Sequence, residues 1–107
     1  MITFVPDTAD SVFRISAFEA NEPLGVCSFT VDGYYMDIVS VDCGDDLIVE
    51  GLARAAMNCG ANRNAYIARI SKELNCPAFE RLGFEGSDVL SVEIPEALGS
   101  CCSGCHN

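Results

Sequence analysis

One stretch, residues 41–60 (VDCGDDLIVEGLARAAMNCG), constrains the fold more than any other part of the sequence. It predicts the end of a strand, a tight acidic turn and then the longest helix of the chain, at residues 46–59. Apolar residues recur in this helix at steps of three and four, which is the spacing of a single helix face. They are Ile48, Leu52, Ala55, Ala56 and Cys59. The stretch therefore predicts a helix that covers a sheet.

Suitable residues stand at both ends of this predicted helix. Asp45 or Asp46 can cap its first turn, and both carboxylates suit the positive end of the helix dipole. Gly60 can end the helix with a positive φ. Gly51 costs about 1 kcal/mol relative to alanine inside a helix, so we interpret it as a point where helix and sheet pack closely.

The first 42 residues predict an antiparallel meander. Strands are expected at residues 1–5, 12–20, 24–31 and 34–41, because each run is apolar or alternating. Asp32-Gly33 predicts a two-residue hairpin turn, and residues 21–23 have turn composition. Pro6 is expected to end the first strand, which leaves residues 7–11 as a loop.

Three more elements are predicted after the long helix. Residues 65–70 form a strand, and Pro77 opens a short helix that stops at Gly83. Residues 88–94 form a last strand, with Leu90, Val92 and Ile94 on one face. The whole order predicts an α+β fold: a mostly antiparallel sheet with a long central helix and a short C-terminal helix packed on it. We expect one domain over residues 1–95 and a cysteine-rich tail over residues 96–107.

Composition limits the classes of partner. Half of the 107 residues are hydrophobic, which is enough for a core, and the formal net charge is −10. Such a charge repels nucleic acids and anionic membranes, so neither is expected as a partner. No apolar run approaches membrane-spanning length, and the first residues lack the pattern of a signal peptide. We therefore expect a cytoplasmic protein.

Residues 75–84 (NCPAFERLGF) resemble the closing motif of the GNAT superfamily of acyl-CoA N-acyltransferases, which reads Asn-x-x-Ala and then Tyr-Glu-Lys-Leu-Gly-Phe. The expected hairpin, strand, long helix and strand follow the order of that family, so the resemblance covers residues 12–94. It implies the GNAT fold, acetyl-CoA as the cofactor and a small-molecule or protein amine as the acceptor. It also implies that the turn before the long helix binds the cofactor. The residues of that turn are Gly44, Asp45, Asp46, Leu47 and Ile48.

The sequence departs from the family pattern in three places. Family members usually begin with a strand and two helices that help to form the acceptor site. Only about ten residues precede residue 12 in this chain, so the resemblance implies a truncated member. Their pyrophosphate loop, Arg/Gln-x-x-Gly-x-Gly/Ala, offers backbone N–H groups, whereas Asp45 and Asp46 stand here without a glycine pair or a base. The tyrosine that the family often uses as a general acid is replaced by Phe79. These departures predict weak or absent CoA binding, and they leave the catalytic residues unknown.

The tail offers a second candidate site. Cys102 and Cys105 have the Cys-x-x-Cys spacing that chelates zinc or another soft metal, with Cys101 and His106 as accessory ligands. The same string matches a haem c attachment pattern, against which the lack of an export signal argues. A thiol redox pair and a plain tail with reactive thiols are further alternatives. Without a signal peptide, no disulfide framework is expected, and the four other cysteines are interpreted as small buried hydrophobes.

Several single residues can be interpreted either as functional groups or as ordinary structural residues. Cys43 lies at a helix start, which can activate a thiol, but the neighbouring aspartates oppose that effect. Asp37 stands in the strand where the GNAT family often places an acid that orients or deprotonates the amine, and a solvated carboxylate is the simpler reading. Arg54 and Arg63 can meet a phosphate or pair with surface acids. Nothing marks any of the three tyrosines, Tyr34, Tyr35 and Tyr66, as an acid.

Three functions remain open from the sequence. The first is a GNAT-like acyltransferase with an altered site. The second is a non-catalytic GNAT-like domain that acts through its metal-binding tail or a partner surface. The third is a thiol redox protein. A shared fold cannot decide among them, because one fold hosts many functions.

Overall fold

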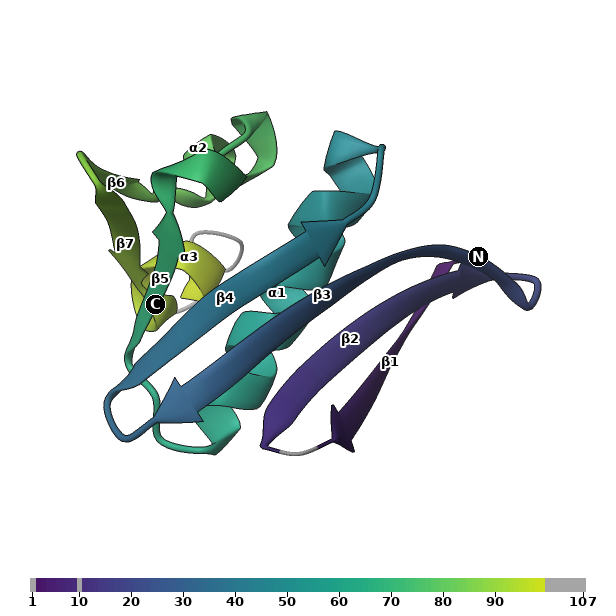
Figure 1. Ribbon diagram of the computed structural model, residues 1–107, viewed down its shortest axis with the longest axis horizontal. Helices are drawn as coiled ribbons and strands as arrows, with labels where there is room; N and C mark the ends of the chain where they lie inside the picture. Colours follow the sequence, from purple (N-terminus) through teal and green to yellow (C-terminus); the bar gives the residue numbers. More distant parts are fainter. Residues whose placement is uncertain (1, 10, 100–107) are drawn as a thin grey trace.

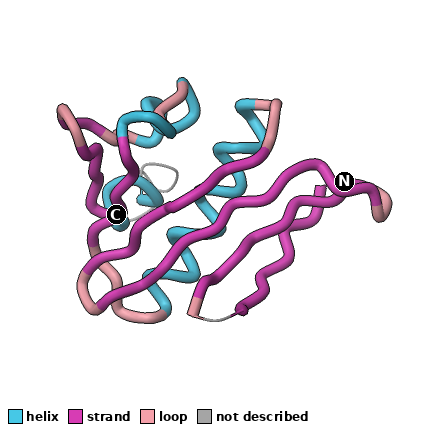
Figure 2. The backbone as a smooth tube through the Cα atoms, in the orientation of Figure 1, coloured by secondary structure: helices cyan, strands magenta, loops and turns pink. Residues whose placement is uncertain are grey.

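The computed structural model describes residues 2–9 and 11–99. Within them, seven strands form one sheet in the order β1-β2-β3-β4-β5-β7-β6. Three α-helices lie on one face of this sheet, which we call the inner face (Figures 1 and 2). The elements are β1 (Ile2–Ala9), β2 (Val12–Glu19), β3 (Glu22–Asp32), β4 (Tyr35–Asp42), α1 (Asp46–Asn62), β5 (Ile67–Ser71), the 3₁₀ turn η1 (Lys72–Leu74), α2 (Pro77–Leu82), β6 (Glu85–Gly86), β7 (Val89–Glu93) and α3 (Ile94–Gly99). The predicted α+β fold with a mostly antiparallel sheet is confirmed.

The antiparallel meander is confirmed over β1 to β4, with both turns displaced from their predicted positions. Asp32 pairs with Tyr35, so the β3–β4 turn is Gly33-Tyr34 rather than Asp32-Gly33. Gly33 supplies the positive φ of 61° that such a turn requires at its first position. The β2–β3 turn is Ala20-Asn21, and both residues have positive φ. The predicted turn at residues 21–23 was wrong in part, because Pro23 already belongs to β3.

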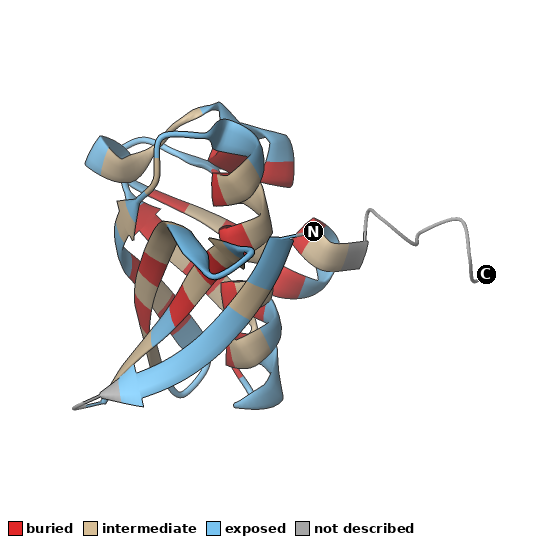
Figure 3. Ribbon diagram, turned by 90° about the vertical axis from the view of Figure 1, so that its right-hand side faces the viewer, coloured by how far each residue is buried: buried red, intermediate tan, exposed pale blue. Residues whose placement is uncertain are grey.

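The first strand does not end at Pro6. It continues to Ala9, and Pro6 lies opposite Ile15 of β2. Proline is tolerated there because β1 is an edge strand, where one side of the backbone needs no ladder donor. Much of this edge strand is exposed (Figure 3). The predicted loop at residues 7–11 was therefore wrong over most of its length.

Helix α1 covers the sheet as predicted, but its buried face is rotated from the predicted stripe. Ile48, Ala55 and Cys59 are only partly buried. The fully buried residues of the helix are Val49, Leu52, Ala53, Ala56, Met57 and Gly60. The rotation brings against the sheet the residues that each follow an expected one by a single position: Val49, Ala53, Met57 and Gly60.

Two glycines let α1 approach the sheet closely. A Cβ on Gly51 would lie 2.5 Å from Cζ of Phe4 in β1, so the predicted close packing there is confirmed. A Cβ on Gly60 would lie 2.6 Å from Sδ of Met36 in β4. The prediction that Gly60 ends the helix with positive φ was wrong: it is a buried helical residue, and α1 continues to Asn62.

The C-terminal third adds α2, β6, β7 and α3. Helix α2 ends as predicted at Gly83, which has a φ of 100°. Ile94 does not extend the last strand, because it is the first residue of α3. Pro95 in the first turn of α3 is compatible with a helix start, and the sequence analysis had treated this segment as the beginning of the tail. No helix in the described residues is long and apolar enough to cross a membrane.

The core lies between the inner face of the sheet and the helices. Alternate residues of β2, β3 and β4 point into it, and no buried polar or charged residue is recorded among the described residues. Its largest fully buried side chains are Phe29, Phe79, Ile15, Met36, Leu52, Met57, Ile70, Ile94 and Cys27. The other face, the outer face, carries mostly exposed or half-buried polar residues.

The close contact between Gly25 of β3 and Cys43 can be tested by substitution. A Cβ on Gly25 would lie 2.6 Å from Cβ of Cys43 and 2.9 Å from the Asp42 carbonyl oxygen. Backbone cannot yield as a long side chain does, so Gly25→Ala should lower the free energy of unfolding by about 1–3 kcal/mol. Urea denaturation would measure the change.

Gly44→Ala is the matched control for this prediction. No atom lies within 4 Å of a Cβ built on Gly44, and its φ is not in the left-handed region. Alanine there should leave the free energy of unfolding unchanged or raise it by about 0.5 kcal/mol. Equal losses in the two variants would contradict the proposed packing.

Candidate functional site

Strands β4 and β5 run parallel and separate soon after they meet. Their pairing is restricted to Tyr35–Ile67, Met36–Ala68 and Asp37–Arg69, and no further β4–β5 pairing occurs within the described residues. Both strands continue beyond this point, β4 to Asp42 and β5 to Ser71. We call the diverging segments, residues 38–42 and 70–71, the β4–β5 fork. They leave a backbone edge of β4 without a neighbouring strand (Figure 1).

A β-bulge lies in β4 at the base of the fork. Ser28 of β3 lies opposite Ser40, and Phe29 lies opposite Ile38, so Val39 is the extra residue. A bulge bends its strand and increases the local twist. Bending of β4 away from β5 is consistent with the short pairing. Val39 itself is 51% exposed.

An ion pair joins the two strands at their last paired position. Arg69 donates to Asp37 through Nε at 2.8 Å and through a second guanidinium nitrogen at 3.0 Å. The same guanidinium lies 4.2 Å from the centre of the Tyr35 ring. Hydrogen bonding to Asp37 raises the pKa of Arg69. The acidic residue that the family resemblance singled out is thus already paired to a cation.

The three tyrosines form one cluster beside this ion pair. Tyr34 stacks on Tyr66 with ring centres 5.2 Å apart and meets Tyr35 edge-on at 5.7 Å. The Tyr66 hydroxyl donates to Glu93 at 3.3 Å, and the charge of Glu93 is the main cause that raises the pKa of Tyr66. A raised pKa makes a phenol a poorer acid, so Tyr66 is not tuned as a general acid.

The carboxylates at the start of α1 occupy the place where an anion would bind. Asp45 is the N-cap, and its Oδ1 accepts a hydrogen bond from the Leu47 N–H at 2.9 Å. Asp46 follows in the first turn. First-turn N–H groups lack partners within the helix and ordinarily serve as the anion donors. One of them is bound here by the protein's own carboxylate.

The arginines next to this helix start are bound to a glutamate. Glu50, one turn into α1, accepts from Arg54 at 3.2 Å and from Nε of Arg81 in α2 at 2.9 Å. The hydrogen bond from Arg81 is the main cause that lowers the pKa of Glu50. Glu50 therefore holds α1 and α2 together and engages cations that a phosphate would require.

Helix α2 carries the residues of the closing motif. Phe79 is fully buried and meets Phe84 edge-on, with ring centres 5.2 Å apart. It has no ionisable hydrogen and does not reach the surface, so it cannot protonate a leaving thiolate. Asn75, just before α2, donates to Glu80 at 3.2 Å, while its Oδ1 is buried without a hydrogen-bond partner in the described structure.

No protein-family model and no curated protein matches this sequence. Solved structures do match. A GNAT family acetyltransferase from Elizabethkingia anophelis, solved with acetyl-CoA bound, has a TM-score of 0.71 at 15% identity, over 86% of this chain and 97% of that one. The chain has the GNAT acetyltransferase fold.

Two further GNAT-fold structures support this assignment. The aminoglycoside 6'-N-acetyltransferase of Enterococcus faecium has a TM-score of 0.65 at 12% identity, over 81% of this chain and 77% of that one. The PaiA N-acetyltransferase of Thermoplasma acidophilum, in complex with coenzyme A, has a TM-score of 0.64 at 14% identity, over 78% of this chain and 61% of that one. Identities this low establish the shared fold alone.

The cofactor-binding candidates of the sequence analysis lie together at one end of the GNAT-fold core. Gly44 precedes the N-cap, and the other four residues make up the N-cap and the first turn of α1. Leu47 is 76% exposed, whereas Ile48 packs against the core. Asn75, which the sequence placed only within the closing motif, has a side-chain oxygen that is closed off from solvent and has no hydrogen-bond partner in the described structure.

The metal candidates Cys101, Cys102, Cys105 and His106 lie outside the described residues. Within residues 2–9 and 11–99, no group of three or more His, Cys, Asp or Glu side chains could hold a metal ion. The other four cysteines are free: Cys27, Cys43, Cys59 and Cys76.

Only one of these four free cysteines is fully buried. Burial raises the pKa of the Cys27 thiol to about 12, which makes it chemically inert. The other three are half-buried, so their interpretation as buried hydrophobes holds only in part. The Cys43 thiol points toward the Asp45 carbonyl oxygen at 3.7 Å, and no histidine lies beside it in the described residues.

The Glu50 ion pairs predict a pH-dependent contribution to stability. Because the pKa of Glu50 is lowered in the folded state, this contribution is fully present above the ordinary value of 4.5 and is lost as pH falls through the lowered pKa. Glu50→Gln should lower the free energy of unfolding by about 0.5–1 kcal/mol at pH 7. Denaturant titrations should show this difference shrink toward about pH 3.

Glu22→Gln is the control for this pH dependence. Glu22 is exposed in β3 and has no recorded ion pair in the described part of the chain. Its substitution should change the free energy of unfolding little at either pH. A Glu50→Gln loss that is equally large in acid would show that packing, rather than charge, is responsible.

Proposed function

We propose that this chain is a GNAT-fold protein whose acetyl-CoA binding and catalysis are degenerate. The observation that carries the proposal is the hydrogen bond from the Leu47 N–H to Asp45, with Asp46 beside it at the start of α1. In this arrangement a diphosphate would meet the negative charges of Asp45 and Asp46, and the Leu47 N–H would not be free to donate a hydrogen bond to it. Like charges a few Å apart cost on the order of 1 kcal/mol even in water and more when desolvated.

The acyl arm is less affected than the diphosphate. The unpaired backbone edge of β4 at the β4–β5 fork offers hydrogen-bond partners to an amide-bearing chain. The Elizabethkingia anophelis structure, whose chain is almost wholly covered by this one, has acetyl-CoA bound. A fold of this size therefore suffices for acetyl-CoA, and the weakness lies in the charges at the helix start.

Catalysis is weakened separately. Phe79 supplies no proton, and Asp37 is held by Arg69. An amine acceptor, small molecule or protein, would thus find no general acid at position 79 and an Asp37 carboxylate that is already paired. The chain then acts as a scaffold that binds acyl-CoA weakly or as a slow acyltransferase for an amine.

Binding measurements test this proposal directly. Calorimetry with acetyl-CoA at low salt should show no binding tighter than about millimolar, which corresponds to about 4 kcal/mol. Asp45→Asn with Asp46→Asn keeps an N-cap oxygen but removes both charges. This double variant should bind acetyl-CoA at least about fivefold more tightly and should bind S-acetylpantetheine, which lacks the diphosphate, as the parent does.

Asp32→Asn with Asp88→Asn is the matched control. It removes the same charge from two exposed positions outside the first turn of α1, of which Asp88 also pairs with Lys72 at 3.6 Å, so it should leave the affinity for acetyl-CoA nearly unchanged. A micromolar dissociation constant for the parent chain would sink the proposal. So would equal gains in both double variants, because the effect would then be net charge alone.

The tail carries a second candidate function. The Cys-x-x-Cys spacing of Cys102 and Cys105, with Cys101 and His106 adjacent, favours binding of zinc or another soft metal through thiolates. This function does not depend on acetyl-CoA. Because thiolates must lose protons to bind, metal affinity should fall as pH drops below the thiol pKa values.

Replacing Cys102 and Cys105 by serine tests this second function. The double variant should take up no zinc, iron or softer metal after reduction. The melting temperature of the metal-free protein should stay nearly unchanged, because the described residues form an apolar core of their own. Metal analysis of anaerobically purified protein measures uptake. Equal uptake by the parent and the double serine variant, or none by either, would end this hypothesis.

A further inference from the structure

Strand β1 leaves one side of its backbone without a neighbouring strand. It stands first in the sheet order, and only β2 pairs with it in the described residues. In an antiparallel pair, alternate residues exchange backbone hydrogen bonds with the partner strand, and the residues between them point their N–H and C=O groups the other way. Thr8 belongs to the second set, because its N–H donates to Oδ1 of Asp7 at 2.8 Å. Pro6, Phe4 and Ile2 alternate with Thr8, so their backbone groups also face the open edge.

Only one half of this edge can donate hydrogen bonds. Pro6 has no N–H, and the N–H of Thr8 is already bound. The N–H groups of Ile2 and Phe4 remain as donors, and the carbonyl oxygens of the same two residues and of Pro6 can accept. The usable donors and acceptors of the edge therefore lie together in residues 2–6.

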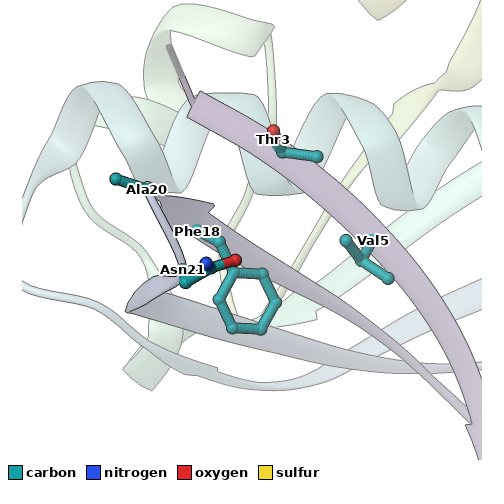
Figure 4. Close-up of a pocket in the computed structure, with 5 residues that line it drawn as sticks. All are labelled: Thr3, Val5, Phe18, Ala20 and Asn21. Atoms are coloured by element: carbon teal, nitrogen blue, oxygen red, sulfur yellow. The ribbon is translucent and has the colours of Figure 1, made fainter.

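This half of β1 is uncharged and partly apolar, although the chain carries a net charge of −10. Edge strands of soluble proteins commonly carry a charged side chain, especially lysine, that prevents pairing with another chain, and residues 2–6 have none. Ile2 is 37% and Val5 42% exposed. An open hollow of about 420 Å³ lies beside them on the outer face, and its lining is also uncharged: Thr3, Val5, Phe18, Ala20 and Asn21 (Figure 4).

We propose that β1 pairs antiparallel with β1 of a second copy of this chain, so that two sheets join into one across a two-fold axis. Such a pairing is self-complementary, because Ile2 and Phe4 of each copy donate to carbonyl oxygens of the other. With Phe4 opposite Phe4, Pro6 of one copy lies opposite Ile2 of the other. This register also keeps the two Asp7 carboxylates about 20 Å apart, well beyond the screening length at physiological salt.

Charge favours a second copy at this edge over other surfaces of the chain. Two chains of net charge −10 repel each other over most of their surfaces, whereas residues 2–6 bring no like charges together. The nearest charges on β1 and β2, Asp7 and Arg14, form an ion pair at 2.8 Å. Strands β2 and β3 separate this edge from the β4–β5 fork, so the proposal does not rest on the proposed function.

Sedimentation equilibrium tests the pairing. An interface built on one strand from each copy is small and belongs to the weak class, so the average mass should rise toward that of a dimer between about 10 µM and 1 mM protein. Added salt should strengthen the association, because it screens the repulsion between two acidic chains. The amides of Ile2 and Phe4 should exchange with solvent more slowly at high protein concentration, and the amide of Thr8 should not change.

Two pairs of variants locate the contact. Val5→Lys places a charge on the pairing strand and should weaken the dimer about tenfold or more, whereas Val89→Lys makes the same change at an exposed valine of β7 and should not. Ile2→Pro removes one donor from each copy and should weaken the dimer about tenfold. Thr8→Pro is its control, because it removes only an amide that Asp7 already binds. Thermal melting checks that each variant folds.

Four results would overturn the proposal. The first is a chain that stays monomeric up to about 1 mM, and the second is association that weakens as salt is added. The third is an equal effect of a variant and its control, which would place the contact elsewhere on the molecule. The fourth is growth to masses above that of a dimer, which would indicate an open head-to-tail contact rather than a closed two-fold pairing.

Discussion

The close packing of α1 on the inner face of the sheet is the constraint on which the rest of the structure depends. Gly51 and Gly60 allow the helix backbone to approach Phe4 and Met36 more closely than any larger residue would permit. The buried side of the helix is otherwise built from aliphatic and small residues. This contact extends over β1, β2, β3 and β4, so one helix closes the core over more than half of the sheet.

That geometry makes β4–α1–β5 the one parallel connection among the paired strands of the described residues. The helix starts just beyond the end of β4, so its first turn lies beside the diverging strands. Asp45 stabilises α1 by capping it. In the degenerate site proposed above, the same carboxylate repels a diphosphate, so the stability of α1 and the affinity for CoA would oppose each other at a single residue.

The sequence predicted the elements that depend on a local pattern of residues. It did not predict the features that depend on where a strand lies in the sheet. The meander, α1 and α2 carry strong periodic or capping signals, and all three are present. Pro6 was misread because its tolerance depends on β1 being an edge strand. The bulge at Val39 breaks the alternation of β4, a signal that was available but not used. The pairing of Asp37 with Arg69 joins residues 32 positions apart, and no local pattern reveals it.

The departures from the family pattern are not equally strong arguments for a degenerate site. The resemblance implied that acceptor-site helices are missing, and no helix covers the outer face in the described residues. That face does not need one for stability, because its strands alternate and present residues such as Ser28, Thr30 and Ser40 to water. The Elizabethkingia anophelis structure, matched over 97% of its length, has acetyl-CoA bound on a chain of similar extent. Chain length alone is therefore a weak argument for degeneracy. The acidic start of α1 and the buried Phe79 are stronger ones, because each removes a specific physical contribution: donors for the diphosphate in one case and a proton for the thiolate in the other.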